Sequence, residues 1–167
     1  RREQHLLRVD AETVEDEREL VDERDVDVAL GVLDDLGRLG HADAGGGVSP
    51  GRDDAAVQAV DELRRLVAAF AQLGLWKVRL TGGEPSLRSE LIEIATAISQ
   101  VPGIRRLAMT TNGFLFQPKA KALRQAGLRR LSFSLDSLDA ANFKKLTGRD
   151  GLAEVLQSIN LAQQLGF

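Results

Sequence analysis

Three successive strand-and-helix units limit the folds open to this chain more than any other feature of its sequence. Short runs of apolar alternation predict strands at residues 76–80, 105–113 and 129–137. A helical pattern that ends in glycine or Pro-Gly follows each strand, and a further helix is predicted from about residue 61 to Gly74. Strands that alternate with helices run parallel and are joined by right-handed crossovers, so the predicted class is α/β.

The predicted strands have one apolar and one polar face, because successive side chains of a strand point to opposite sides. The apolar set, which helices should cover, is Val78, Leu80, Leu107, Met109, Leu131, Phe133 and Leu135. The polar set is Lys77, Arg79, Ala108, Thr110, Ser132, Ser134 and Asp136. A doubly wound sheet buries both faces, whereas a parallel barrel with an open lumen accepts polar side chains inside it. The pattern therefore predicts a partial parallel (β/α) barrel of TIM-like type, of about three strand–helix units, with a ligand inside.

Polar loops with the sequences TGGEP, TTNG and SLDS follow the three predicted strands. Active sites form in the loops at the C-terminal ends of barrel strands. Arg79 stands near one such end, where an enclosed guanidinium needs an anion, either a protein carboxylate or a ligand phosphate. TGGEPS is not a P-loop, because no Lys-Ser or Lys-Thr follows its glycines. The cations Lys144, Lys145 and Arg149 are expected to form a solvated surface without a special role.

The first sixty residues differ in composition from the rest of the chain. They hold 16 of the 25 acidic residues but only 7 of the 22 basic ones, and they contain no aromatic residue, lysine, isoleucine or asparagine. Such a segment tends to stay disordered. The predicted division is an acidic segment at 1–60, disordered or not authentic protein, and a partial barrel at 61–167. A shifted reading frame of a GC-rich gene would yield the composition of 1–60.

Composition also limits the classes of function. The chain has no cysteine, and His5 and His41 stand far from other candidate ligands, so no protein-only metal site is predicted. A net charge of −3 gives no support for a nucleic-acid or membrane partner. No leader and no apolar run of about 18 residues is visible, and the expected location is cytoplasmic.

Several motifs resemble the GTP 3′,8-cyclase family of the radical S-adenosylmethionine superfamily. They are KVRLTGGEPSLR at 77–88, LAMTTNGFL at 107–115 and the segment 123–167, which contains SLDSLD and TGRD. The resemblance covers about 61–167, and SLDSLD with TGRD is its most specific part. It implies a radical SAM barrel of which this chain contains a part. It also implies a lyase that uses S-adenosylmethionine and a [4Fe-4S] cluster to convert GTP to 3′,8-cyclo-7,8-dihydro-GTP, the first step of molybdenum cofactor biosynthesis.

The resemblance also implies roles for individual residues. The positions that match S-adenosylmethionine contacts are Gly83 and Ser134, with Gly82 and Glu84 in the same loop. The positions that match GTP contacts are Arg79 and Thr110. Asn112 and Asp136 belong to the same motif loops and are weaker candidates. A homodimer of the intact family member is left open.

The chain departs from the family pattern where the cluster should be bound. The expected C-x3-C-x2-C motif before residue 61 is absent, so the chain as written is expected to be inactive, with no catalytic residue assigned. Three alternatives stay open. They are a cysteine-less module that binds GTP and S-adenosylmethionine, another radical SAM enzyme, and a truncated product without function.

Overall fold

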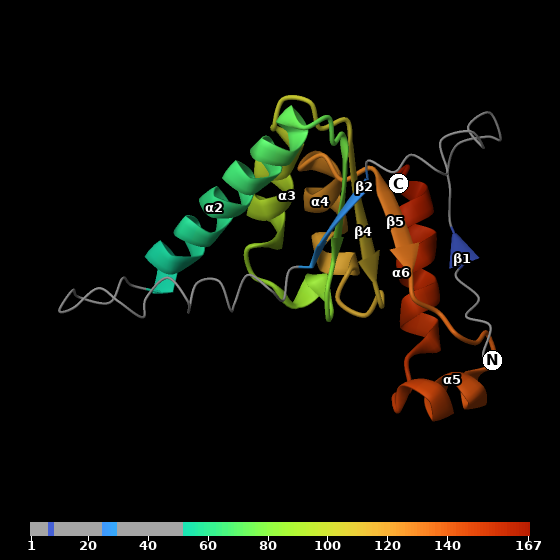
Figure 1. Ribbon diagram of the computed structural model, residues 1–167. Coiled ribbons are helices and arrows are strands. Elements are labelled where there is room, and N and C mark those ends of the chain that lie inside the picture. The colour runs from blue at the N-terminus through green and yellow to red at the C-terminus, as the bar shows by residue number, and fades with distance from the viewer. Residues whose placement is uncertain (1–6, 9–24, 30–51) are drawn as a thin grey trace, which may run out of the picture.

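The computed structural model describes residues 7–8, 25–29 and 52–167 of the 167-residue chain. The described strands form one sheet in the order β1-β5-β4-β3-β2 (Figure 1). The strands are β1 Leu7–Arg8, β2 Asp25–Ala29, β3 Lys77–Thr81, β4 Arg106–Thr111 and β5 Arg130–Phe133. β2, β3, β4 and β5 pair in parallel, and β1 pairs antiparallel with β5. The prediction of a parallel α/β sheet is confirmed.

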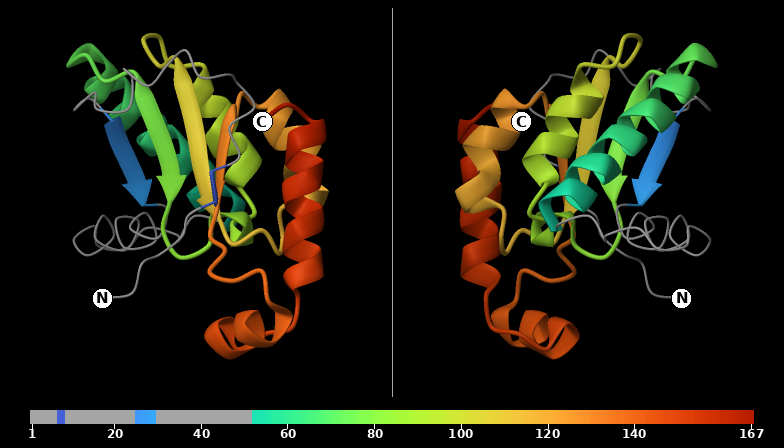
Figure 2. Two further views of the ribbon diagram at one scale, coloured as in Figure 1. Left: turned by 90° about the vertical axis from the view of Figure 1, so that its right-hand side faces the viewer. Right: turned by 90° about the vertical axis from the view of Figure 1, so that its left-hand side faces the viewer.

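Helices alternate with the parallel strands, and all but α5, which lies beyond the C-terminal ends of the strands, lie on one face of the sheet (Figure 2). They are α2 Arg52–Gln72, α3 Leu91–Ser99, α4 Ala120–Gln125, α5 Ala140–Thr147 and α6 Leu152–Gln164. Within the described residues the sheet does not close on itself. The architecture is therefore part of a (β/α) barrel, with helices outside and the polar strand face on the inner side.

The core lies between this sheet and its helices, as the alternation of the strands predicts. Six strand residues of the apolar set, Val78, Leu80, Leu107, Met109, Leu131 and Phe133, belong to one buried cluster. Helical residues of the same cluster include Leu63, Val67, Ile94, Ile98, Leu123 and Ala162. Leu66, whose spacing in the helical pattern matches that of the buried Leu63 and Val67, is 44% exposed, because α2 lies at the outer side of α3 and buries only a narrow stripe.

Strand ends differ from the prediction at β4 and β5. β4 ends at Thr111, where Asn112 starts a turn and Gly113 takes a positive φ of 85°. β5 ends at Phe133, although the alternation continues to Ser137. The chain then leaves the sheet toward α5, whose first turn is capped by Asp139, which accepts a hydrogen bond from the N–H of Asn142 at 2.8 Å.

α2 crosses the predicted boundary near Asp61, because it begins at Arg52. The stretch from 53 to 60 contains three alanines and two aspartates near the helix start, a composition that favours a helical first turn. β2 also falls in the predicted acidic segment, and its register pairs Asp27 with Arg79. The rest of that segment, with His5 and His41, lies outside the described residues, so its predicted disorder stays a prediction.

Asp61 forms an ion-pair cluster on the surface of α2. Its Oδ1 atom accepts hydrogen bonds from Arg64 Nε at 3.1 Å and Nη2 at 2.8 Å, and its Oδ2 atom lies 3.3 Å from Arg65 Nη2. The hydrogen bond from Arg64, together with the charges of Arg64 and Arg65, outweighs burial and lowers the pKa of Asp61.

The Asp61→Asn variant is expected to be slightly less stable at neutral pH, with a melting temperature lower by about 2 °C or less, because the pairs are exposed. A carboxyl with a depressed folded-state pKa stabilises the fold above its unfolded pKa of about 3.9 and loses this contribution as pH falls through the folded value. The two proteins should therefore converge as pH falls below the folded-state pKa of Asp61. Thermal melts from pH 7 to pH 2.5 measure this, and a constant difference would contradict it.

Candidate functional site

Arg79, Thr110 and Ser132 meet on the polar face of the sheet. Arg79 lies on β3, Thr110 on β4 and Ser132 on β5, and each is partly buried. Arg79 Nη1 lies 3.1 Å from Ser132 Oγ and 3.4 Å from Thr110 Oγ1, and donates hydrogen bonds to both hydroxyls. The strand register also pairs Asp27 of β2 with Arg79. The structure thus brings together two predicted site residues and adds Ser132, which the strand alternation had placed on this face.

Glu84 joins the loop after β3 to the loop after β4. Its Oε1 atom accepts from Ser86 N at 3.0 Å, Ser86 Oγ at 2.5 Å and Thr111 Oγ1 at 2.7 Å. Its Oε2 atom accepts from Asn112 N at 2.7 Å. Glu84 therefore holds two strand-end loops in place through one carboxylate. Its predicted contact with S-adenosylmethionine stays a prediction. The role of Thr111 could not be foreseen, because strand alternation puts it on the apolar face.

The loop after β4 is also fixed from the helical side. Ser158 of α6 is fully buried and its hydroxyl donates to the carbonyl oxygen of Gly113 at 2.7 Å. A Cβ at Gly113 would lie 3.1 Å from the ring of Phe133 and 3.3 Å from Val155, so a side chain there would be tightly packed as well as strained by the positive φ. Lys119 Nζ donates to two carbonyl oxygens of the loop after β3, at 2.7 and 2.8 Å. The site is therefore built on loops with fixed backbones.

The two glycines after β3 differ in what the protein requires of them. Gly82 has a φ of 124°, a conformation that only glycine adopts easily. Gly83 needs no such conformation, and a Cβ there would meet no protein atom within 4 Å. Ser134, directly after β5, is exposed, and its N–H donates to the carbonyl oxygen of Thr111 at 2.9 Å. Open space at Gly83 and an exposed serine hydroxyl fit a ligand that approaches the loop backbone closely.

The residues present do not fit an iron–sulfur cluster. The sequence contains no cysteine, and among the described residues no group of three or more His, Asp or Glu side chains is arranged to hold a metal ion. Cluster iron is held by cysteine thiolates. No side chain of this chain can supply that ligand.

Two hollows lie away from this site. One, of about 480 Å³, lies between α2 and α3 and is lined by Val57, Val60, Asp61, Arg64, Glu90, Glu93 and Ala97. The other, of about 330 Å³, lies at the N-terminal edge of the sheet and includes Arg105, Arg106 and Arg129. Burial, followed by the neighbouring charge of Arg129, lowers the pKa of Arg124 near that edge. Neither hollow includes Arg79, Thr110 or the glycines after β3.

Within the described part, none of the helices is long and apolar enough to cross a bilayer.

Known proteins resemble most of this chain. Residues 40–167 match the family model described as the Radical SAM superfamily. The GTP 3′,8-cyclase of Stenotrophomonas maltophilia strain K279a is 53% identical over 108 residues, which are 65% of this chain and 33% of that protein. The GTP 3′,8-cyclases of Tolumonas auensis and Synechococcus elongatus are each 47% identical, over 108 and 107 residues respectively. They are matched over 32% and 33% of their lengths, so this chain spans about a third of the curated relatives it matches.

Proposed function

This chain belongs to the radical SAM superfamily, and from that premise we propose that it is a part of a GTP 3′,8-cyclase that carries contacts for GTP and S-adenosylmethionine. The proposed substrate is GTP, and the proposed GTP contacts are Arg79 and Thr110. For S-adenosylmethionine the proposed contacts are Gly83 and Ser134, with Gly82 and Glu84 shaping the loop. In a cyclase that also holds the [4Fe-4S] cluster, bound S-adenosylmethionine would supply the radical chemistry of the superfamily, and this cysteine-free chain is proposed to be inactive on its own.

The observation that carries the proposal is the hydrogen-bonded group of Arg79, Thr110 and Ser132 on the inner face of the sheet. A half-buried guanidinium with hydroxyls around it can donate bidentate hydrogen bonds to phosphate oxygens. The loops that carry Gly83 and Ser134 follow β3 and β5, which flank β4 on its two sides, and both leave the sheet at the same edge. Nucleotide and cofactor would therefore lie next to each other, as a reaction between them requires.

A second candidate is a module that binds GTP and S-adenosylmethionine without redox chemistry. The cysteine-free sequence favours it, since these 167 residues cannot hold the cluster by thiolates. Translation of the gene upstream in all frames separates the two. A C-x3-C-x2-C motif in another frame supports a damaged or interrupted cyclase, and its absence from every frame supports the module. The motifs SLDSLD and TGRD do not favour the third alternative, a different radical SAM enzyme.

Cytoplasmic location, a homodimer and the lack of nucleic-acid or membrane partners stay predictions.

GTP binding by the full chain tests the proposal. Wild-type protein should bind GTP in calorimetry, and Arg79→Ala should weaken binding about 10-fold to 100-fold, because a charge-assisted hydrogen bond contributes about 1.5–3 kcal/mol. Arg105→Ala is the matched control, because it removes an exposed arginine at the opposite edge of the sheet. Circular dichroism establishes that each variant is folded. Wild-type protein that binds no GTP, or equal losses in both variants, would overturn the proposal.

A further inference from the structure

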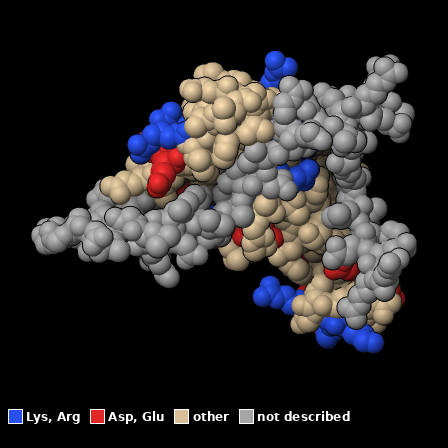
Figure 3. All heavy atoms as spheres, viewed as in Figure 1, with Lys and Arg blue, Asp and Glu red and all other residues tan. Residues whose placement is uncertain are grey.

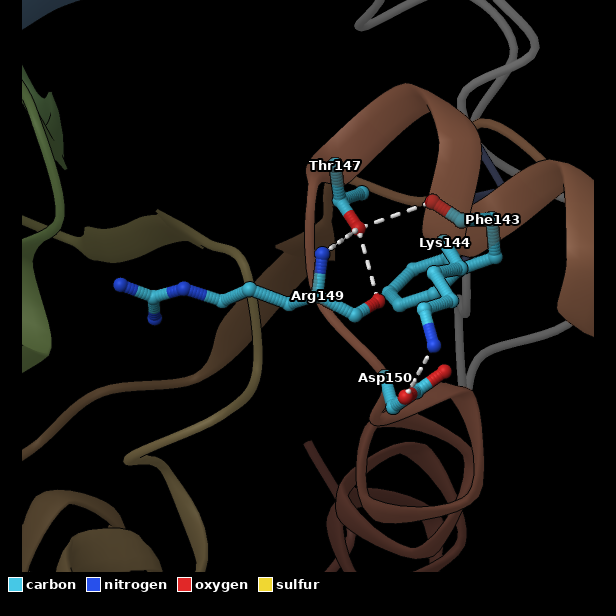
Figure 4. A network of polar contacts seen from close by, with 5 residues as sticks. All are labelled: Phe143, Lys144, Thr147, Arg149 and Asp150. Carbon is cyan, nitrogen blue, oxygen red and sulfur yellow. Dashed lines mark hydrogen bonds and ion pairs between the residues drawn. The ribbon is translucent and has the colours of Figure 1, made fainter.

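Arg149 lies in a turn whose backbone is fixed on both sides. α5 ends at Thr147, and Gly148 follows with a left-handed φ of 73°. The hydroxyl of Thr147 donates to the carbonyl oxygen of Phe143 at 2.8 Å, lies 3.2 Å from the carbonyl oxygen of Arg149 and accepts the Arg149 N–H at 3.3 Å (Figure 4). On the other side, Gly151 has a φ of 147°, and a Cβ there would overlap the ring of Phe114. A turn held in this way gives the Arg149 side chain a defined starting direction.

Arg149 and Asp150 turn away from each other. The carboxylate of Asp150 accepts a hydrogen bond from Lys144 Nζ at 2.7 Å, while the Arg149 side chain extends away from both (Figure 4). Its guanidinium lies over the ring of Phe114, 6.0 Å from the ring centroid. Among the described residues, no carboxylate lies within ion-pair distance of Arg149. Asp150, the next residue in sequence, is therefore paired with Lys144 and not with Arg149, whose guanidinium lies over the ring of Phe114.

The support for Arg149 is part of the candidate site. Phe114 follows β4, its N–H donates to Asn112 Oδ1 at 3.1 Å, and its ring packs on Phe143 with centroids 6.3 Å apart. The N–H of Asn112 in turn donates to Glu84. Arg149 therefore packs on the loop that follows β4 at the C-terminal edge of the sheet, and Thr110 and Arg79 lie on strands that end at this edge. Lys and Arg atoms also gather over α5 at the lower right of Figure 3, but Lys144 is paired and Lys145 has no such support.

We infer that Arg149 is an anion-binding residue at the rim of the candidate site, and that it contacts phosphate groups of the bound nucleoside triphosphate. This inference rests on the proposed function and differs from the expectation that Arg149 belongs to a solvated surface without a special role; Arg149 is exposed. A planar guanidinium stacked on a ring can donate two parallel hydrogen bonds to phosphate oxygens. Stacking also reduces the side-chain entropy that is lost when the phosphate binds. Arg79 inside and Arg149 at the rim would then contact the phosphate chain from two sides.

Calorimetry on the full chain, with GTP and with guanosine as probes, tests the inference. Arg149→Ala should weaken GTP binding about fivefold or more and leave guanosine binding unchanged, because only the phosphates are contacted. It should also flatten the salt dependence of GTP affinity. Arg149→Lys keeps the charge but not the planar fork, so it should fall between wild type and Arg149→Ala. Lys145→Ala removes a neighbouring charge of α5 and should change neither affinity.

The outcomes separate this inference from the proposed function. Wild-type protein that binds no GTP overturns both. If Arg79→Ala weakens GTP binding and Arg149→Ala does not, the proposed function stands and the role of Arg149 is wrong. Equal effects of Arg149→Ala and Lys145→Ala would mean unspecific charge attraction and overturn the inference. An equal loss of guanosine and GTP binding in Arg149→Ala would mean that Arg149 supports the loop, which also overturns it.

Discussion

Replacing Glu84 with alanine is expected to lower the free energy of unfolding by about 2–3 kcal/mol, because four hydrogen bonds to one carboxylate are lost together. This loss of stability comes mainly from donor groups that would remain without an acceptor. The N–H of Asn112 and the hydroxyl of Thr111, which is buried, would lose their acceptor. Urea unfolding of wild type and variant at pH 7 measures the difference.

Two control variants separate the loop-fixing role of Glu84 from general charge effects. Glu93→Ala removes an exposed acid on α3 and should change stability by less than about 0.5 kcal/mol. Glu84→Gln keeps one acceptor oxygen and should recover part of the loss. Equal stability of Glu84→Ala and Glu93→Ala would show that the loops are held by other contacts. Because these loops carry proposed ligand contacts, Glu84→Ala should also weaken GTP binding in proportion to the loss of loop order.

Phe116→Ala should be the more damaging change, with a loss of about 3–5 kcal/mol in the free energy of unfolding. Phe116 is fully buried and packs edge-to-face on Phe133, with centroids 5.5 Å apart and an interplanar angle of 89°. Its ring also contacts that of Phe167 at 5.6 Å and 68°. Truncation removes the central ring of this trio and leaves a cavity between β5 and the C-terminal end of the chain. Denaturant unfolding followed by tryptophan fluorescence from Trp76 measures the loss.

Phe70→Ala is the matched control for this prediction, because Phe70 is a partly exposed residue of α2 outside the buried cluster. The same number of atoms is removed, but water already reaches the site. The expected loss is about 1 kcal/mol. Similar losses in the free energy of unfolding for Phe70→Ala and Phe116→Ala would mean that the ring contacts of Phe116 with Phe133 and Phe167 contribute little to stability. Phe116→Leu should lose less than Phe116→Ala, since it fills most of the cavity.

The sequence alone predicted the parts of the fold that depend on periodicity. Alternation in β3 and β4 placed Val78 and Met109 in the core and Arg79 and Thr110 together on the other face, because side-chain direction in a strand follows from position. Glycines that follow the helical patterns predicted where the helices end, because glycine readily takes the positive φ that ends a helix. These features require no knowledge of distant contacts.

Features that depend on distant partners could not be predicted. Leu66 has core-like spacing in α2 yet is exposed, since only the arrangement of α2 on α3 decides which residues are covered. Glu84 and Thr111 are 27 residues apart in sequence, and no local pattern links a loop carboxylate to a strand hydroxyl. β2 was missed because an Asp-Val alternation in an acid-rich segment gives a weak signal until its register with β3 is known.

The arginines at the N-terminal edge of the sheet donate to carbonyl oxygens at the C-terminal ends of helices. α3 and α6 follow parallel strands, so they point their C-terminal, partly negative ends toward the edge where Arg129 donates to the carbonyl oxygen of Arg124 and Arg124 donates to that of Leu165. The partly positive helix starts remain at the edge that carries the candidate site. The guanidinium charges therefore offset the partly negative helix ends at their own edge of the sheet.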